Sequence, residues 1–102
     1  MTCEVEKIGS SARITIEGVV DERGAAVLKE RFRDLSRDQF NELIIDMGGV
    51  SHFGSSGLGG LLLCYKAMAA RQGSLRLTRT PAAIYSLMRD LQLDTLFEIN
   101  GD

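Results

Sequence analysis

The chain has 102 residues, 44% of them hydrophobic, which fits one domain over residues 1–102 built around a single core. Its net charge of -2 and the lack of any Lys/Arg cluster argue against nucleic acid as a partner. No apolar stretch approaches the roughly 20 residues that span a bilayer, and the N-terminus lacks a signal-peptide pattern, so we expect a soluble cytoplasmic protein without a membrane partner.

Two strands are predicted at the start of the chain. Glu4 to Ile8 alternates weakly between polar and apolar residues, and residues 12–16 alternate clearly. The Gly-Ser-Ser sequence between them predicts a hairpin turn. Asp21 is then a candidate N-cap, because apolar residues follow it at the three- and four-residue spacing of an amphipathic helix: Ala25, Leu28, Phe32 and Leu35.

A third strand is predicted from Leu43 to Met47. It lacks polar alternation, so we expect it in the middle of the sheet and covered on both faces. Gly48 and Gly49 are expected to end it. A leucine-rich helix follows and runs to about Gln72, with Gly73 as the residue just past its end.

The last third of the chain predicts one more strand and helix. Leu75 and Leu77 alternate with polar residues, and Thr80 and Pro81 suit the N-cap and first position of a helix. Its buried stripe is expected to comprise Ile84, Leu87, Met88 and Leu91. Residues 96–99 are expected to add a short strand or helical turn. This order predicts an α/β domain with a small, mixed, mostly parallel sheet of four to five strands and three to four helices packed against it.

Ser55 and Ser56 are predicted to lie at the start of the second helix. The first backbone N–H groups of a helix have no partners within it, so a capping hydroxyl, a carboxylate or a phosphate would be stabilised there. Three nearby glycines, Gly57, Gly59 and Gly60, are poor helix formers. They indicate close approach either by a neighbouring element or by a partner.

Other kinds of site fit the sequence less well. Asp46, His52 and Ser55 do not make a convincing catalytic triad, because His52 is only three residues from the serine. The GSSGLGG segment lacks the lysine of a P-loop and the spacing of a dinucleotide fold, which leaves nucleotide binding weakly supported. Cys3 and Cys64 lack paired ligand spacing, so we expect reduced thiols, no metal and no cofactor. Leu63 and Cys64 widen the apolar side of their helix, either as a docking surface or as a wide buried side.

The segment from Asp46 to Gly59, DMGGVSHFGSSGLG, resembles the D-L-S-G-V-x-x-x-D-S-S-G-L-G signature of STAS domains of anti-sigma factor antagonists. The likeness continues through the following helix, the G-S-L strand, the T-P-A-A helix and the closing L-D-T-L-F-E-I segment. Upstream, residues 18–21 are similar to the family's G-x-L-D. The resemblance therefore covers nearly the whole chain.

The resemblance implies a regulatory protein without enzymatic activity. Ser55 corresponds to the serine that an anti-sigma factor with serine kinase activity phosphorylates, and Ser56 is the alternative acceptor. In the family, the unmodified protein binds the anti-sigma factor and frees a sigma factor, and a PP2C-type phosphatase reverses the modification. The residues expected to bind the partner or to form the rim of the site are Asp21, Asp46, Gly54, Gly57, Leu58 and Gly59.

One residue departs from the family pattern. Gly54 stands where the family has an aspartate just before the serine. Two hypotheses follow for the pair of serines. Either Ser55 is phosphorylated, more slowly or by a diverged kinase, or the domain binds a partner constitutively and the serines only cap the helix.

Overall fold

The computed structural model describes residues 1–101, and a single five-stranded sheet forms its centre. The strands lie in the sheet in the order in which they occur in the chain. The first is antiparallel to the second, and each later strand is parallel to its neighbour. The strands are β1 (Thr2–Ile8), β2 (Ser11–Val20), β3 (Glu42–Phe53), β4 (Ser74–Thr80) and β5 (Glu98–Gly101). The tight turn between the first two is made possible by Gly9, with a φ of 59°.

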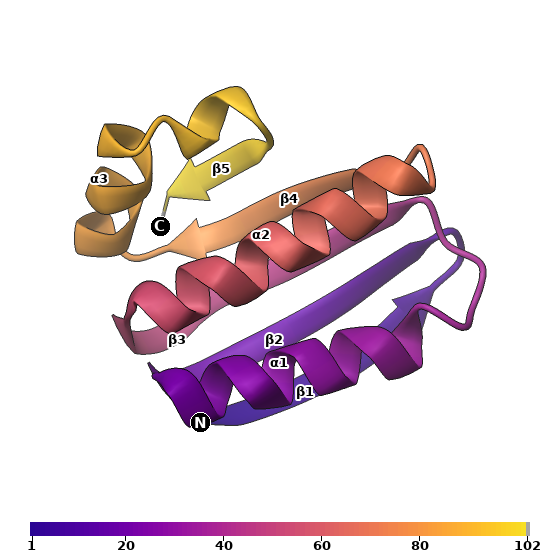
Figure 1. Cartoon of the computed structure of the whole chain (residues 1–102), viewed down its shortest axis with the longest axis horizontal. Helices are drawn as coiled ribbons and strands as arrows, with labels where there is room; N and C mark the ends of the chain where they lie inside the picture. The colour runs from indigo at the N-terminus through magenta and orange to yellow at the C-terminus, as the bar shows by residue number, and fades with distance from the viewer. Residues whose placement is uncertain (102) are drawn as a thin grey trace.

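Three α-helices connect the parallel strands: α1 (Glu22–Leu35), α2 (Ser55–Ala70) and α3 (Ala82–Asp90), the last followed by a short 3₁₀ helix, η1 (Leu93–Thr95). Figure 1 shows α1 and α2 side by side over one face of the sheet, with α3 beside the β4–β5 edge. The predicted α/β fold, with a mixed and mostly parallel sheet, is therefore confirmed.

The core lies between the sheet and the helices. Ile14, Ile45 and Leu77 are in register across three strands and are fully buried, and they pack with Leu28 and Leu61 of the helices. The opposite face of the sheet carries charged and half-buried side chains. The expectation that β3 is covered on both faces was wrong, because burial alternates along it and Ile44 is only half-buried.

Gly48 and Gly49 do not end β3, contrary to the prediction. The strand continues to Phe53 because β2 also continues and pairs with it there, Glu17 with Gly49 and Val20 with Phe53. A Cβ on Gly49 would lie 2.6 Å from Cγ of Glu17, and one on Gly48 would overlap the Arg79 guanidinium. Both glycines therefore make room for neighbouring side chains and do not form a turn.

Two helix boundaries also differ from the prediction. Gln72, with a φ of 59°, takes the left-handed position after α2, whereas a Cβ on Gly73 would lie 2.7 Å from the carbonyl oxygen of Asn41. Gly73 thus serves close packing. Thr80 is the last residue of β4 and is fully buried, and Pro81 is the N-cap of α3.

The buried side of α3 is narrower than predicted. Ile84 and Met88 are buried, but Leu87 and Leu91 are exposed because the short helix covers only the edge of the sheet. After η1, residues 98–101 pair with β4, so a short final strand forms, but it begins two residues later than predicted because Leu96 and Phe97 still belong to the turn after η1.

Candidate functional site

The carboxyl ends of β2 and β3 lie next to each other, and a helix begins immediately after each of them. Val20 pairs with Phe53, and the backbone N–H of Gly54 donates to the carbonyl oxygen of Val20 at 3.0 Å. This contact fixes the start of α1 close to the start of α2. Two helix N-termini therefore lie side by side at the carboxyl ends of β2 and β3, and each carries the positive end of a helix dipole.

The first of these termini is capped by a carboxylate. Oδ1 of Asp21 accepts a hydrogen bond from the backbone N–H of Gly24 at 2.9 Å. This hydrogen bond is the main reason why the pKa of Asp21 is lowered from its ordinary value of 3.8. The predicted N-cap role of Asp21 is thus confirmed, and its side chain is exposed.

The second terminus has no side-chain cap. Its N-cap residue is Gly54, which has extended backbone, and no acidic residue occupies the first turn of α2. The carbonyl oxygen of Gly54 accepts from the N–H of Leu58 at 3.1 Å and so begins the helix. A Cβ on Gly54 would have ordinary contacts of 3.7 and 3.8 Å, so there is room for a side chain. The missing cap follows from the residue type and not from crowding.

The two serines at this terminus differ in their exposure. Ser55 is the first residue of α2 and is exposed, whereas Ser56 is half-buried. Within residues 1–101, no hydrogen bond of either hydroxyl is observed. Ser55 is therefore the more accessible hydroxyl beside the uncapped N–H groups of α2.

The glycines after the serines do not share one role. Gly57 is buried, and a Cβ there would lie 2.9 Å from Cγ1 of Val20 and 3.1 Å from the ring of Phe53. Gly59 is exposed, and a Cβ there would have nothing within 4 Å. The first thus allows α2 to pack against the sheet, while the second lies on the outer surface.

A protein-family model matches residues 3–98 of the chain, and that family is described as Mlab, STAS domain. The chain belongs to the STAS domain family. No curated protein matches it.

Solved structures of anti-sigma factor antagonists have the same fold as this STAS domain. One is a putative antagonist from Thermotoga maritima, with a TM-score of 0.88, 15% identity and coverage of 98% of this chain and 86% of that chain. Another, from Mycobacterium paratuberculosis, has a TM-score of 0.86, 22% identity and coverage of 99% and 86%. A third is the antagonist SpoIIAA in its unphosphorylated form, with a TM-score of 0.83, 15% identity and coverage of 96% and 87%. A phosphorylated form of SpoIIAA from Bacillus is similar as well, with a TM-score of 0.78 and 15% identity.

Asp46 is not brought into the site of the STAS domain, contrary to our expectation. It precedes the end of β3 by seven residues, a distance of about 20 Å along a strand. Its Oδ1 accepts from the N–H of Gly48 at 2.9 Å and lies 3.6 Å from Nε of Arg79. Asp46 therefore organises the face of the sheet that α1 and α2 do not cover, and it cannot form a triad with Ser55.

Of the other predicted rim residues, Asp21 and Gly54 adjoin Ser55 through the paired ends of β2 and β3. Leu58 is half-buried against the core one turn into α2, and Gly59 is exposed there. Gly57 lies beneath the surface, so it does not form part of the rim.

Sequence reasoning missed an apolar side chain beside Asp21. Val19 is 44% exposed, next to Met1, which is 37% exposed. Both line a hollow with Asp21 and Val27 at the start of α1. The signal was present, because the alternation of buried Ile14 and Ile16 places Val19 on the outward-facing side of β2.

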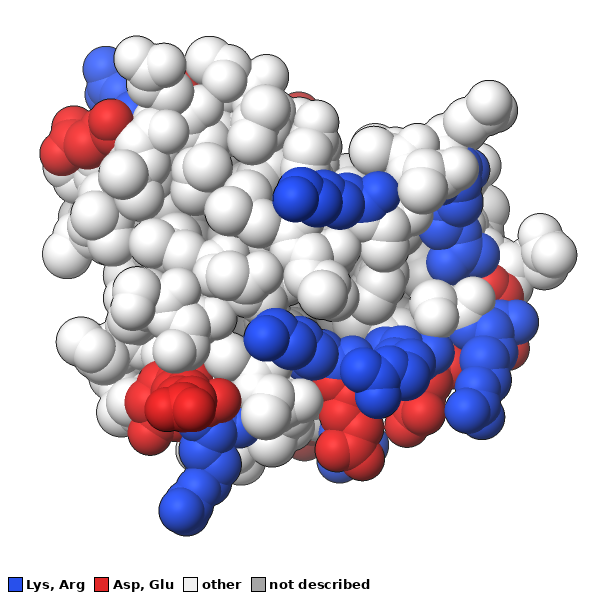
Figure 2. Space-filling model, viewed as in Figure 1, with Lys and Arg blue, Asp and Glu red and all other residues white. Residues whose placement is uncertain are grey.

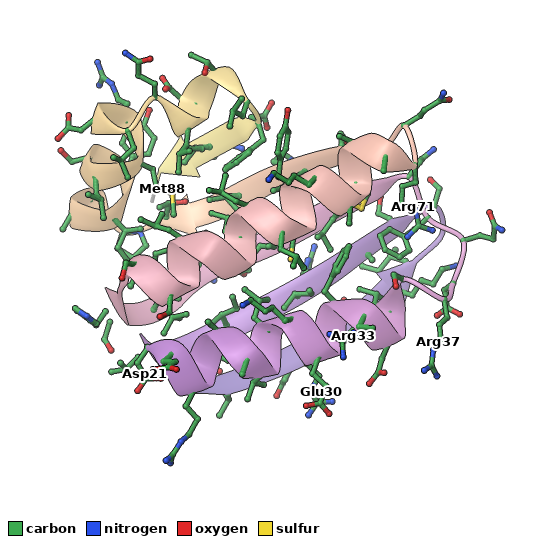
Figure 3. The ribbon with its side chains drawn as sticks, in the orientation of Figure 1. Asp21, Glu30, Arg33, Arg37, Arg71 and Met88 are labelled. Atoms are coloured by element: carbon green, nitrogen blue, oxygen red, sulfur yellow. The ribbon has the colours of Figure 1, made fainter. Side chains whose placement is uncertain are left out.

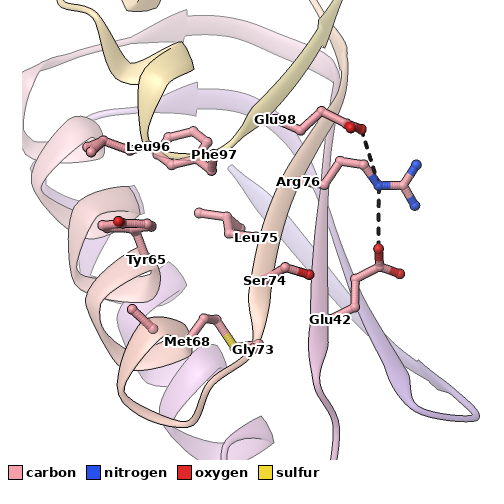
Figure 4. Close-up of a pocket in the computed structure, with 11 residues that line it drawn as sticks. Glu42, Tyr65, Met68, Gly73, Ser74, Leu75, Arg76, Leu96, Phe97 and Glu98 are labelled. Carbon is pink, nitrogen blue, oxygen red and sulfur yellow. Dashed lines mark ion pairs between the residues drawn. The ribbon is translucent and has the colours of Figure 1, made fainter.

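A larger hollow lies at the other end of α2 and is separate from Ser55. It has a volume of about 360 Å³ and lies between the last turns of α2 and strands β4 and β5 (Figure 4). Tyr65 and Phe97 form part of its apolar wall, and Nε of Arg76 lies 3.7 Å from Glu42 and 3.8 Å from Glu98. Nε of Arg76 thus lies within ion-pair distance of both carboxylates, but it makes no hydrogen bond among the described residues.

Among residues 1–101, no group of three potential metal ligands comes together. In the same range, no helix has the length and apolar character needed to cross a bilayer.

Proposed function

We propose that this STAS domain is an anti-sigma factor antagonist controlled by phosphorylation of Ser55. In this proposal its partner is an anti-sigma factor with serine kinase activity, and a PP2C-type phosphatase restores the unmodified form in the cytoplasm. The observation that carries the proposal is the exposed Ser55 hydroxyl at an uncapped helix N-terminus without acidic neighbours in its first turn. The similar structures include an antagonist solved in phosphorylated and unphosphorylated forms.

A phosphate at Ser55 suits the electrostatics of this terminus. It adds about 1.5 to 2 negative charges and three acceptor oxygens. The free N–H groups and the positive end of the α2 dipole stabilise that charge within the domain. A partner packed over Ser55 would instead have to desolvate the phosphate, so modification weakens binding without a change of fold.

The absence of a carboxylate at position 54 also affects the switch. In a domain with an aspartate N-cap, that carboxylate competes with the phosphate for the same N–H groups and repels it. With Gly54, the phosphate meets an unoccupied cap. Phosphorylation of Ser55 should therefore stabilise the start of α2 more in this chain than in a Gly54→Asp variant.

The proposal is tested by incubating the purified chain with a candidate serine kinase, such as one encoded beside it, and ATP. Mass spectrometry should locate one phosphate on Ser55, with no modification of Ser55→Ala and normal modification of Ser56→Ala. Ser55→Asp should weaken binding to that kinase, while Ser55→Ala should retain it. An unmodified Ser55 combined with equal binding of wild type and both variants would exclude the switch.

Gly54 favours a second candidate function, a STAS module that binds its partner constitutively. In that case the serines serve only the start of α2. Ser55→Ala and Ser55→Asp would then leave partner binding unchanged. The same binding measurements therefore separate the two functions.

A further inference from the structure

The outer side of α2 is apolar although no element of the described chain covers it. Lys66 is the only charged residue among the 16 of this helix. Leu63 is 45% exposed, Leu62 is half-buried and Gly59 is exposed. Together with Lys66 they line a shallow hollow of about 480 Å³. The outer side of a surface helix is normally polar, so this side is suited to contact with another molecule.

Basic side chains flank this apolar side. Lys66 lies on α2 and Arg71 directly follows the helix, and residues 47–89 contain no Asp or Glu. The neighbouring helix adds Lys29 and Arg33, which are one turn apart. Figure 2 shows Lys and Arg gathered across the two helices, with most of the visible Asp and Glu along the lower rim.

Lys29 lies near the side of α1 that faces α2, and Arg33 follows it one turn later on the exposed surface. Ala25, one turn before Lys29, packs near α2, because a Cβ on Gly60 would lie 3.8 Å from the Cβ of Ala25. At the end of α1, the carbonyl oxygen of Ser36 accepts from Arg71, which follows α2, at 3.5 Å. In Figure 3, Asp21 lies at one end of this face, and Arg33, Arg37 and Arg71 lie toward the other end.

Ser55 lies on the same side of α2 as this surface. Gly59, Leu62 and Lys66 follow it at four, seven and eleven residues, the spacing of one helix side. A group on Ser55 is therefore at one end of a continuous surface that begins with the hydroxyl, continues over leucines and ends at basic side chains.

We propose that this α1–α2 face, formed by Gly59, Leu62, Leu63, Lys66, Lys29 and Arg33, binds an acidic amphipathic helix of a protein partner. The apolar side of that helix packs on the two leucines, and its carboxylates lie against the three basic side chains. Charge complementarity favours this occupant over a second copy of the chain. A two-fold dimer through this face would bring like charges together.

The inference rests on the proposed function and adds the chemistry of the partner. A phosphate on Ser55 places negative charge at one end of a surface that binds an acidic helix. Repulsion of that helix then contributes to its release, besides the cost of desolvating the phosphate.

The test uses the full chain labelled with ¹⁵N and two synthetic 18-residue helical peptides. Both have leucine on one side, and the other side is glutamate in one peptide and lysine in its counterpart. The glutamate peptide should bind saturably, with the amide shifts concentrated at residues 59–66, and its affinity should fall as NaCl is raised. The lysine peptide should not bind. Equal binding of both peptides, or no binding of the glutamate peptide at millimolar concentration, would overturn the inference.

Variants then test the surface itself. Lys66→Glu and Leu63→Ser should each weaken binding of the glutamate peptide by about tenfold. Arg89→Glu, an exposed charge change on α3, is the matched control and should have no effect. Circular dichroism and thermal unfolding confirm that each variant is folded. Unchanged affinity in both surface variants, or self-association by sedimentation that Leu63→Ser abolishes, would refute an acidic helix as the occupant.

Ser55→Asp separates this inference from the proposed function. If the surface variants weaken the peptide while Ser55→Asp leaves both peptide and kinase binding unchanged, the docking surface stands and the switch fails. If Ser55→Asp weakens kinase binding but the surface variants change nothing, the switch stands and the docking surface is wrong.

Discussion

At the scale of single residues, some positions near Ser55 serve packing within the domain, whereas others lie on its surface. Gly57 and Gly59 are two residues apart on α2, but only a Cβ on the first would meet other atoms closely. The sequence could not distinguish them, because the difference depends on Val20 and Phe53 from two other segments. Substitutions at the two glycines provide a matched comparison.

Gly57→Ala should destabilise the domain and Gly59→Ala should stabilise it. Alanine gains up to about 1 kcal/mol over glycine within a helix. At Gly57, contacts of 2.9 and 3.1 Å with Val20 and Phe53 oppose that gain, and overpacking costs typically about 1–3 kcal/mol. Urea unfolding measures both free energies. If Gly57→Ala raised the free energy of unfolding as much as Gly59→Ala does, the close packing of α2 on the sheet would be wrong.

Asp21 makes a pH-dependent contribution to stability. Its pKa in the folded protein is lowered below 3.8 by the hydrogen bond from the N–H of Gly24, so the ionised form favours folding. The stabilisation is complete above the unfolded pKa and is lost as the pH falls below 3.8 through the folded pKa. Asp21→Asn keeps a capping oxygen but does not titrate. Urea unfolding at several pH values should show a smaller acid-side loss of stability in this variant than in wild type, whereas equal losses would contradict the linkage.

At the scale of the element, α1 and α2 begin next to each other at the carboxyl ends of β2 and β3, but only α1 has a side-chain cap. The sequence predicted the carboxylate cap of α1 correctly, because Asp21 directly precedes an amphipathic repeat. It also placed the start of α2 near Ser55. A local pattern was sufficient in both cases, since a cap and its helix are adjacent in the chain.

Gly54→Asp should stabilise α2 by a few tenths of a kcal/mol, the usual difference between aspartate and glycine at an N-cap. The new carboxylate has space, because a Cβ there meets nothing closer than 3.7 Å. Gly54→Ala is the control. It adds the same Cβ without an acceptor and should lower the free energy of unfolding by about 0.5 kcal/mol. Chemical denaturation of both variants measures the effect, and equal stabilities would show that the start of α2 needs no acceptor.

At the scale of the whole molecule, long-range contacts decided what the sequence did not reveal. The alternation of β and α segments predicted the mostly parallel sheet and the helices that pack on it, and the apolar run of residues 43–47 predicted its central strand. The continuation of β3 past Gly48 depends on β2 and on Arg79, and the position of Asp46 depends on that continuation. The signature placed Asp46 near Ser55 in sequence, but an extended strand carries the two apart.

The accessibility of the two cysteine thiols to alkylation measures which part of the domain unfolds first. Burial raises the pKa of the Cys64 thiol to about 12, and the side chain is fully buried between α2 and the sheet. Burial also raises the pKa of Cys3, which lies on the edge strand β1 and is 8% exposed.

An edge strand detaches at a lower free-energy cost than the centre of a core. Alkylation at a pH of about 8, mapped by mass spectrometry along a urea series, should therefore label Cys3 before Cys64, and Cys64 only with global unfolding. Cys3→Ser is the control, and in this variant the labelling of Cys64 should still coincide with global unfolding as followed by circular dichroism. Labelling of Cys64 at low urea, while circular dichroism remains native, would mean that α2 separates from the sheet without global unfolding.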